Sequence, residues 1–173
     1  MMARLCCILI LLSVGLRAAG AETLTEITLA APNARLTLLE RGGRCFLTYA
    51  GTGAPTEIEL APEPPCAFFR NRHDAAPRVF AYPSFNADAV LLVGGGRLSA
   101  QEAAERDANR WIPVGETCIN AVQGIVLDGE TIHASRLILR GLSCPALGRD
   151  EKDYWMIADD YAKTARRGQA VPQ

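Results

Sequence analysis

Four isolated cysteines constrain this chain more than any other feature of its sequence. The chain contains six cysteines, and the first two, Cys6 and Cys7, fall within an apolar N-terminal run. The remaining four are Cys45, Cys66, Cys118 and Cys144. An even number of separated cysteines in an exported chain predicts two structural disulfides.

Of the possible pairings, we favour Cys45 with Cys66 and Cys118 with Cys144. Each pair closes a loop of about 20 to 25 residues around a predicted hairpin, which the chain-entropy model values at about 3 kcal/mol. A zinc site is the weaker alternative, because zinc-binding cysteines normally come in closely spaced C-x-x-C pairs. Redox catalysis also needs such a pair or one activated thiol. We therefore expect no metal and no cofactor.

The N-terminus predicts export. Residues 1–4 are a short basic start, residues 5–16 are apolar, and residues 19–21 are the small residues that a signal peptidase reads. The apolar run is shorter than the roughly 20 residues that span a bilayer. We therefore expect residues 1–21 to be a cleaved signal peptide and the product to be periplasmic or secreted, with no stable membrane anchor.

The rest of the chain is long enough for one domain. We expect residues 22–167 to form a single disulfide-braced globular domain and residues 168–173 to be a flexible tail. The full chain carries 18 Lys and Arg against 19 Asp and Glu, and removal of the leader takes away Arg4 and Arg17. No basic excess remains to hold phosphate groups, which argues against nucleic acid as a partner.

Short strands separated by turn residues dominate the pattern. Residues 35–39 and 44–49 flank Arg41-Gly42-Gly43 and predict a hairpin. Further strands are expected at residues 56–60, 67–69, 78–82 and 87–93. The last of these is almost wholly apolar, which is typical of the middle of a sheet.

Gly94-Gly95-Gly96-Arg97 is expected to end that apolar strand as a flexible connector. Its place between a strand and a helix is typical of a phosphate-binding turn. However, Ser99 stands where the dinucleotide fingerprint needs glycine, and no Lys-Ser or Lys-Thr follows. Ser99 and Glu102 have the spacing of a capping box and predict a surface helix over residues 98–111.

The last third predicts a hairpin and a helix. Residues 119–127 and 130–139 flank Asp128-Gly129, a strong two-residue hairpin signal. Asp150 is expected to cap a helix that runs to about Ala165. The helix has an apolar stripe made of Tyr154, Ile157, Ala158, Tyr161 and Ala162. These elements predict an α+β, strand-dominant fold: an antiparallel sheet or partly open sandwich with two disulfides and a C-terminal helix.

Four side chains are candidate binding residues: Arg70, Arg72, His73 and Trp111. The two arginines suit an anionic group, and Asp74 beside His73 is the arrangement of an oriented general base. A solvated loop is the favoured interpretation, because no neighbouring serine or cysteine offers a nucleophile. Trp111 is favoured over Trp155 as an interface anchor because a loop is expected around it.

His133 is the other of the two histidines in the chain. It lies far from His73 in the sequence and lacks the short spacing of a metal-ligand pair, so we expect a hydrogen-bonded or exposed sheet residue. No residue is assigned a catalytic role.

The lack of a convergent nucleophile, base or metal set favours a non-enzymatic binding protein, such as an inhibitor, an immunity protein or an envelope accessory protein. At the level of fold class, the small disulfide-braced plan resembles such periplasmic proteins. A protein or a cell-envelope component is the expected ligand. Two alternatives stay open: a small secreted hydrolase that uses His73 and Asp74, and a purely structural envelope protein.

Overall fold

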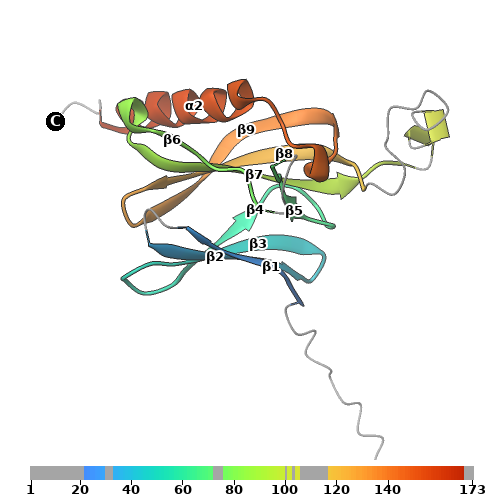
Figure 1. Ribbon diagram of the computed structural model, residues 1–173, viewed down its shortest axis with the longest axis horizontal. Helices are drawn as coiled ribbons and strands as arrows, with labels where there is room; N and C mark the ends of the chain where they lie inside the picture. Colours follow the sequence, from blue (N-terminus) through green and yellow to red (C-terminus); the bar gives the residue numbers. More distant parts are fainter. Residues whose placement is uncertain are drawn as a thin grey trace, which may run out of the picture.

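The computed structural model describes residues 22–29, 33–71, 76–99, 101–102, 104–105 and 117–169. These residues form two antiparallel sheets and a long C-terminal helix, α2 (Glu151–Gln169). In Figure 1 the first sheet lies below the second, and α2 covers the other face of the second sheet. The predicted α+β, strand-dominant fold is confirmed.

Sheet A is an antiparallel meander of strands in chain order. Its strands are β1 (Glu22–Leu29), β2 (Ala34–Arg41), β3 (Arg44–Ala50) and β4 (Thr56–Leu60). The predicted hairpin is confirmed: Gly42 and Gly43 join β2 to β3 with φ angles of 59° and 76°. Glycine enters this region without steric cost. Strand β1 is additional to the predicted strands.

Sheet B has the strand order β5-β7-β8-β9, and β6 pairs with the first part of β7. Its strands are β5 (Ala67–Phe68), β6 (Phe80–Tyr82), β7 (Ala87–Arg97), β8 (Ile119–Asp128) and β9 (Thr131–Ser143). Short 3₁₀ turns follow two of them, η1 (Pro83–Phe85) after β6 and η2 (Pro145–Leu147) after β9. The predicted β8–β9 hairpin is confirmed, with Gly129-Glu130 as its turn because Asp128 still pairs with Thr131.

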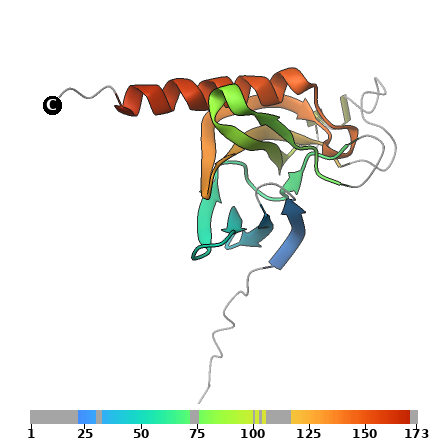
Figure 2. The same ribbon diagram turned by 60° about the vertical axis from the view of Figure 1, so that its left-hand side comes forward.

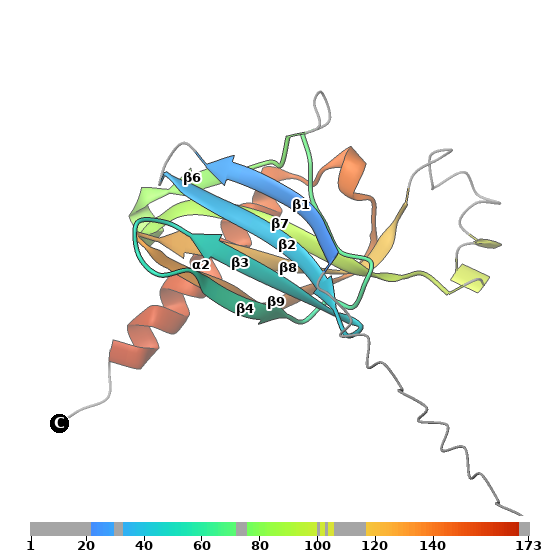
Figure 3. The ribbon, with the colours of Figure 1, turned by 90° about the horizontal axis from the view of Figure 1, so that it is seen from below.

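Sheet B is covered on both faces. Seen from below, sheet A crosses in front of sheet B (Figure 3). Leu91 and Val93 of β7 pack against sheet A, whereas Val90 and Leu92 pack with the buried stripe of α2. This burial on both faces explains the nearly continuous apolar sequence of β7 and confirms its central position. The predicted stripe of α2 is also confirmed, since Tyr154, Ile157, Ala158 and Ala162 are buried.

The prediction that residues 94–96 end the apolar strand is wrong. Strand β7 continues through them to Arg97, and all three glycines are buried. A Cβ atom on Gly95 would lie 2.4 Å from the Glu63 carbonyl oxygen and 2.8 Å from Cys66 Sγ. The glycines therefore allow close approach of a neighbouring segment, and they form neither a flexible connector nor a phosphate-binding turn.

Both predicted disulfides are present. Cys45 in β3 is bonded to Cys66, directly before β5, so this bond joins sheet A to sheet B. Cys118, directly before β8, is bonded to Cys144, directly after β9, so this bond joins the two strands at the open end of the hairpin. Two structural disulfides indicate an oxidising compartment rather than the reducing cytosol. Within the described residues, no helix has the length and apolar character needed to cross a membrane.

The helices follow their predicted capping signals. Helix α2 begins directly after Asp150 and runs to Gln169, into the segment predicted as a tail. The Glu102 N–H donates to Ser99 Oγ at 3.2 Å, and the Ser99 N–H donates to Glu102 Oε2 at 3.0 Å, which is the predicted capping box. Residues 101–102 and 104–105 are helical. The rest of the predicted helix after residue 105 lies outside the described residues.

Candidate functional site

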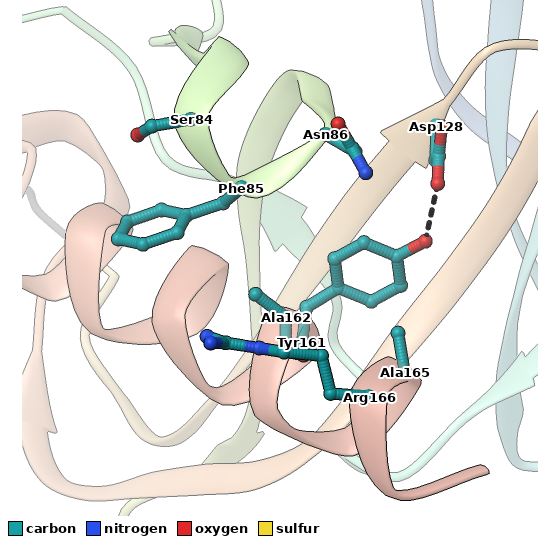
Figure 4. Close-up of a pocket in the computed structure, with 8 residues that line it drawn as sticks. All are labelled: Ser84, Phe85, Asn86, Asp128, Tyr161, Ala162, Ala165 and Arg166. Atoms are coloured by element: carbon teal, nitrogen blue, oxygen red, sulfur yellow. Dashed lines mark hydrogen bonds between the residues drawn. The ribbon is translucent and has the colours of Figure 1, made fainter. Parts of the chain in front are cut away.

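A pocket of about 470 Å³ lies between η1 and the C-terminal half of α2 (Figure 4). We call it the α2–η1 pocket. It is lined by Ser84, Phe85, Asn86, Asp128, Tyr161, Ala162, Ala165 and Arg166. Its volume falls within the range of about 300 to 1,000 Å³ that is typical of small-molecule sites. Figure 2 shows η1 alongside α2, whose C-terminal end projects beyond the sheets.

Turn η1 forms one wall of this pocket. Pro83 occupies the start of the turn, where its fixed φ is favourable. Asn86 ends the turn with φ 54° and ψ 38°, a left-handed conformation that Asn adopts more readily than most residues. The Asn86 N–H donates to the Pro83 carbonyl oxygen at 3.1 Å. The Asn86 side chain is exposed, and its amide nitrogen points toward the Tyr161 ring in Figure 4.

A hydrogen bond between α2 and the end of β8 closes the other side. The Tyr161 hydroxyl donates to Asp128 Oδ2 at 2.6 Å. Burial raises the pKa of Tyr161 to about 12, and the bond to Asp128 adds to the rise. Tyr161 is therefore a neutral donor near pH 7. The Asp128 carboxylate still has lone pairs to accept further hydrogen bonds from a ligand.

Arg166 supplies the positive charge of the pocket. Its Nε donates to the Ala162 carbonyl oxygen at 3.2 Å. Within the described part of the chain, Arg166 forms no ion pair, so its terminal nitrogens stay available to a ligand. Ala162 and Ala165 line the pocket on α2, and their small side chains leave space between the helix and η1.

A row of aromatic rings adjoins the pocket. The Phe85 and Trp155 ring centroids are 5.8 Å apart, and those of Tyr82 and Phe85 are 6.4 Å apart. Trp155 is 46% exposed. We call Tyr82, Phe85 and Trp155 the aromatic surface. Phe85 belongs to both features, so the aromatic surface and the α2–η1 pocket form one continuous candidate site.

A second pocket of about 320 Å³ lies on the other side of Tyr161 and is lined in part by His133, Ser135 and Asp160. The Ser135 hydroxyl donates to Asp160 Oδ2 at 3.4 Å and accepts from the Leu137 N–H at 3.0 Å. His133 is half-buried, and its ring lies 5.0 Å from that of Tyr161. Ser135 is therefore held by a carboxylate and a backbone amide, which is not the serine–histidine contact of nucleophilic catalysis.

Of the predicted binding residues, Arg70 is the one that the structure describes, and it lies outside the α2–η1 pocket. Arg70 is exposed and lines a smaller pocket of about 220 Å³ together with Thr117 and Pro145. Its backbone N–H donates to the Pro145 carbonyl oxygen at 3.0 Å. Arg72, His73, Asp74 and Trp111 lie outside the described residues, so their predicted roles stay predictions. Among the described residues, no cluster of His, Cys, Asp and Glu could hold a metal ion.

The site that the structure does describe was not predicted from the sequence. Asp128 carries a turn signal and Tyr161 belongs to the apolar stripe, so neither suggests a ligand contact. Trp155 lies outside the apolar stripe of an amphipathic helix, and this position is the one sequence signal that the residue is exposed.

No family model matches this chain, and no curated protein or solved structure matches it.

Proposed function

We propose that this protein is a non-enzymatic binding protein of the periplasm or the extracellular space, which holds its ligand at the aromatic surface and the α2–η1 pocket. The leader-like sequence of residues 1–21 supports export. The disulfides suit the same location. Inhibitors, immunity proteins and envelope accessory proteins are the classes that this description covers.

The exposure of Trp155 carries the proposal. Tryptophan gains much of its stabilising effect from burial, yet 46% of this side chain faces solvent. Phe85 and Tyr82 extend the exposed ring into a continuous surface. Contiguous apolar patches of this kind mark interaction sites, and Trp and Tyr are enriched among residues that dominate binding energy.

Rigidity supports the same proposal. Strand β6, η1 and α2, which carry the site, rest on sheet B. One disulfide ties sheet B to sheet A, and the other holds the ends of the β8–β9 hairpin. A surface that is already ordered loses less conformational entropy when it binds, so more of the contact energy appears as affinity.

A capture experiment tests the proposal. The disulfide-bonded protein is immobilised and exposed to increasing amounts of cell-envelope extract, and the bound material is quantified. We expect saturable capture that Trp155→Ala reduces at least about tenfold, a loss typical of a residue that dominates binding. Phe46→Ala is the matched control, because Phe46 is a half-buried aromatic residue on the outer face of sheet A.

Two outcomes contradict the proposal. If the extract yields no saturable ligand, the protein is not a binding protein of the envelope. If Trp155→Ala and Phe46→Ala bind as well as the unmodified protein, the ligand docks on another surface.

A further inference from the structure

We propose that the ligand of the α2–η1 pocket is a neutral saccharide unit, with the Phe85 and Trp155 rings as its stacking platform. This inference rests on the proposed function and adds the chemical class of the ligand. It follows from the charge of the pocket, the hydrogen-bonding groups around it, and the aromatic rings beside it.

The charge balance of the pocket disfavours ligands that carry a net charge. Among the lining residues, Asp128 is the one acid and Arg166 the one base. Tyr161 stays neutral because its hydroxyl is partly buried and donates a hydrogen bond to Asp128. An anion that pairs with the guanidinium also meets the carboxylate, and a cation that pairs with the carboxylate also meets the guanidinium, so an unfavourable contact offsets the favourable one in each case. A ligand without net charge avoids both penalties.

The polar groups match adjacent hydroxyl groups. The Asp128 carboxylate accepts hydrogen bonds, the Arg166 guanidinium donates them, and the Asn86 carboxamide does both. No hydrogen bond to the Asn86 side chain exists within the described part of the chain, and it points toward the pocket in Figure 4. A sugar hydroxyl both donates and accepts, so neighbouring hydroxyls satisfy these planar groups in turn.

The aromatic rings match the remaining surface of a sugar ring. A pyranose exposes polar hydroxyls around its rim and C–H groups on its faces. The face of an aromatic ring is electron-rich and attracts such C–H groups. Phe85 lines the pocket, and the Trp155 ring lies 5.8 Å from it in an edge-to-face arrangement. The site therefore offers aromatic rings to the C–H faces of a sugar and polar side chains to its hydroxyl groups.

The same residues support binding without cleavage. Glycoside hydrolysis requires two carboxyl groups, one on each side of the scissile bond. Asp128 is the single carboxylate among the residues that line the pocket, and it already accepts a hydrogen bond from the Tyr161 hydroxyl. The pocket is therefore arranged to hold a saccharide and not to hydrolyse it.

Calorimetric titration of the disulfide-bonded protein tests this assignment. The neutral probes are a panel of mono- and disaccharides that includes maltose, N-acetylglucosamine and N,N′-diacetylchitobiose. Glucuronate and glucosamine are the anionic and cationic comparisons. We expect at least one neutral saccharide to bind saturably, and each charged probe to bind at least about tenfold more weakly because of the opposing charges.

Two variants locate the binding. Asp128→Asn keeps the shape and an acceptor for Tyr161 but removes the charge, so we expect about tenfold weaker saccharide binding, since charge-assisted hydrogen bonds are about twice as strong as neutral ones. Ala165→Leu fills the pocket and is expected to abolish binding. Phe46→Ala on sheet A is expected to change nothing. Thermal unfolding of each variant checks that the fold is intact.

Three results overturn the inference: no neutral saccharide binds, a charged probe binds more tightly, or Ala165→Leu binds normally. If Trp155-dependent capture from envelope extract persists while every saccharide fails, the ligand class is wrong and the proposed function stands. If both experiments fail, the proposed function is wrong as well.

Discussion

The outer face of sheet A and the surface around α2 differ in how their polar side chains are paired. On sheet A, basic side chains are matched with acidic ones from other strands: Arg35 with Glu26, Arg41 with Glu57, and Arg44 with Glu59. At the α2–η1 pocket, Asn86 and Arg166 have no comparable side-chain partners within the described residues. Charged side chains in and beside α2 are also paired, Arg149 with Asp153 and Lys163 with Asp159, so the difference is confined to the pocket.

The two faces of sheet B differ in a related way. The face toward sheet A is packed with aliphatic residues such as Leu91 and Ile125. The face toward α2 packs against Tyr154 of the helix, whose buried hydroxyl has no hydrogen-bond partner among the described residues. If ligands dock on the α2 side as proposed, packing between the sheets contributes to stability alone, and packing against α2 also supports the site.

Two large-to-small substitutions sharpen this comparison most. Leu47→Ala opens the core between the sheets, and Ile157→Ala opens the core beneath α2, where both side chains are fully buried. Each is expected to lower the free energy of unfolding by about 2 to 5 kcal/mol, as measured by urea denaturation. Under conditions where both variants remain folded, only Ile157→Ala should weaken ligand capture. Equal effects on capture would show that the site does not depend on the seating of α2.

Removal of the bond between the sheets is the next largest change. The double variant Cys45→Ala/Cys66→Ala opens a loop of 21 residues. The expected loss of unfolding free energy is about 3 kcal/mol, because the unfolded chain regains entropy. Capture by the folded variant should persist, since the site lies on sheet B and α2. Lost capture in a variant with native circular dichroism would contradict this division of roles.

Tyr161→Phe tests the hydrogen bond that closes the pocket. We expect this variant to lower the free energy of unfolding by no more than about 1.5 to 3 kcal/mol. The lost hydrogen bond has a charged acceptor, Asp128, which stays half-exposed to water. The raised pKa sets the pH dependence. The protonated hydroxyl stabilises the fold fully below pH 10, the unfolded pKa, and this contribution is lost as the pH rises toward 12. The difference in the free energy of unfolding between the variant and the unmodified protein should therefore shrink above pH 10. A difference that stays constant in urea denaturation would contradict this pH dependence.

Tyr154→Phe has the smallest expected effect. Burial raises the pKa of Tyr154, whose ring packs edge-to-face on Phe80 at 4.7 Å. Removing an unpaired buried hydroxyl while keeping the ring should leave the free energy of unfolding unchanged or raise it by up to about 1 kcal/mol. A loss above about 1 kcal/mol in urea denaturation would mean that the hydroxyl has a partner in solution.

The sequence predicted the elements whose signals are local. The turn at Gly42-Gly43, the β8–β9 hairpin and the buried stripe of α2 each depend on residues close together in the chain, and the two disulfides were predicted from the number and spacing of the cysteines. Residues 94–96 were misread because their contacts, with Glu63 and Cys66, are distant in the sequence. Without those contacts, three glycines are indistinguishable from a linker.

The candidate site was less predictable for the same reason. Asp128 and Tyr161 are 33 residues apart and meet only because α2 packs over the end of β8. Taken singly, one is a turn residue and the other a core residue. The aromatic surface contains Trp155, which the sequence ranked below Trp111 as an interface anchor, and the role of Trp111 stays a prediction. Spatial neighbours, and not residue types, distinguish the site.

We propose above that ligands dock on the α2 side of the molecule. Amide chemical-shift mapping tests it most directly, with ¹⁵N-labelled protein and the fraction that the protein captures from envelope extract. The account predicts saturable shifts at η1, Asp128 and residues 155–166, with sheet A unchanged. Shifts confined to strands β1 to β4 would contradict it.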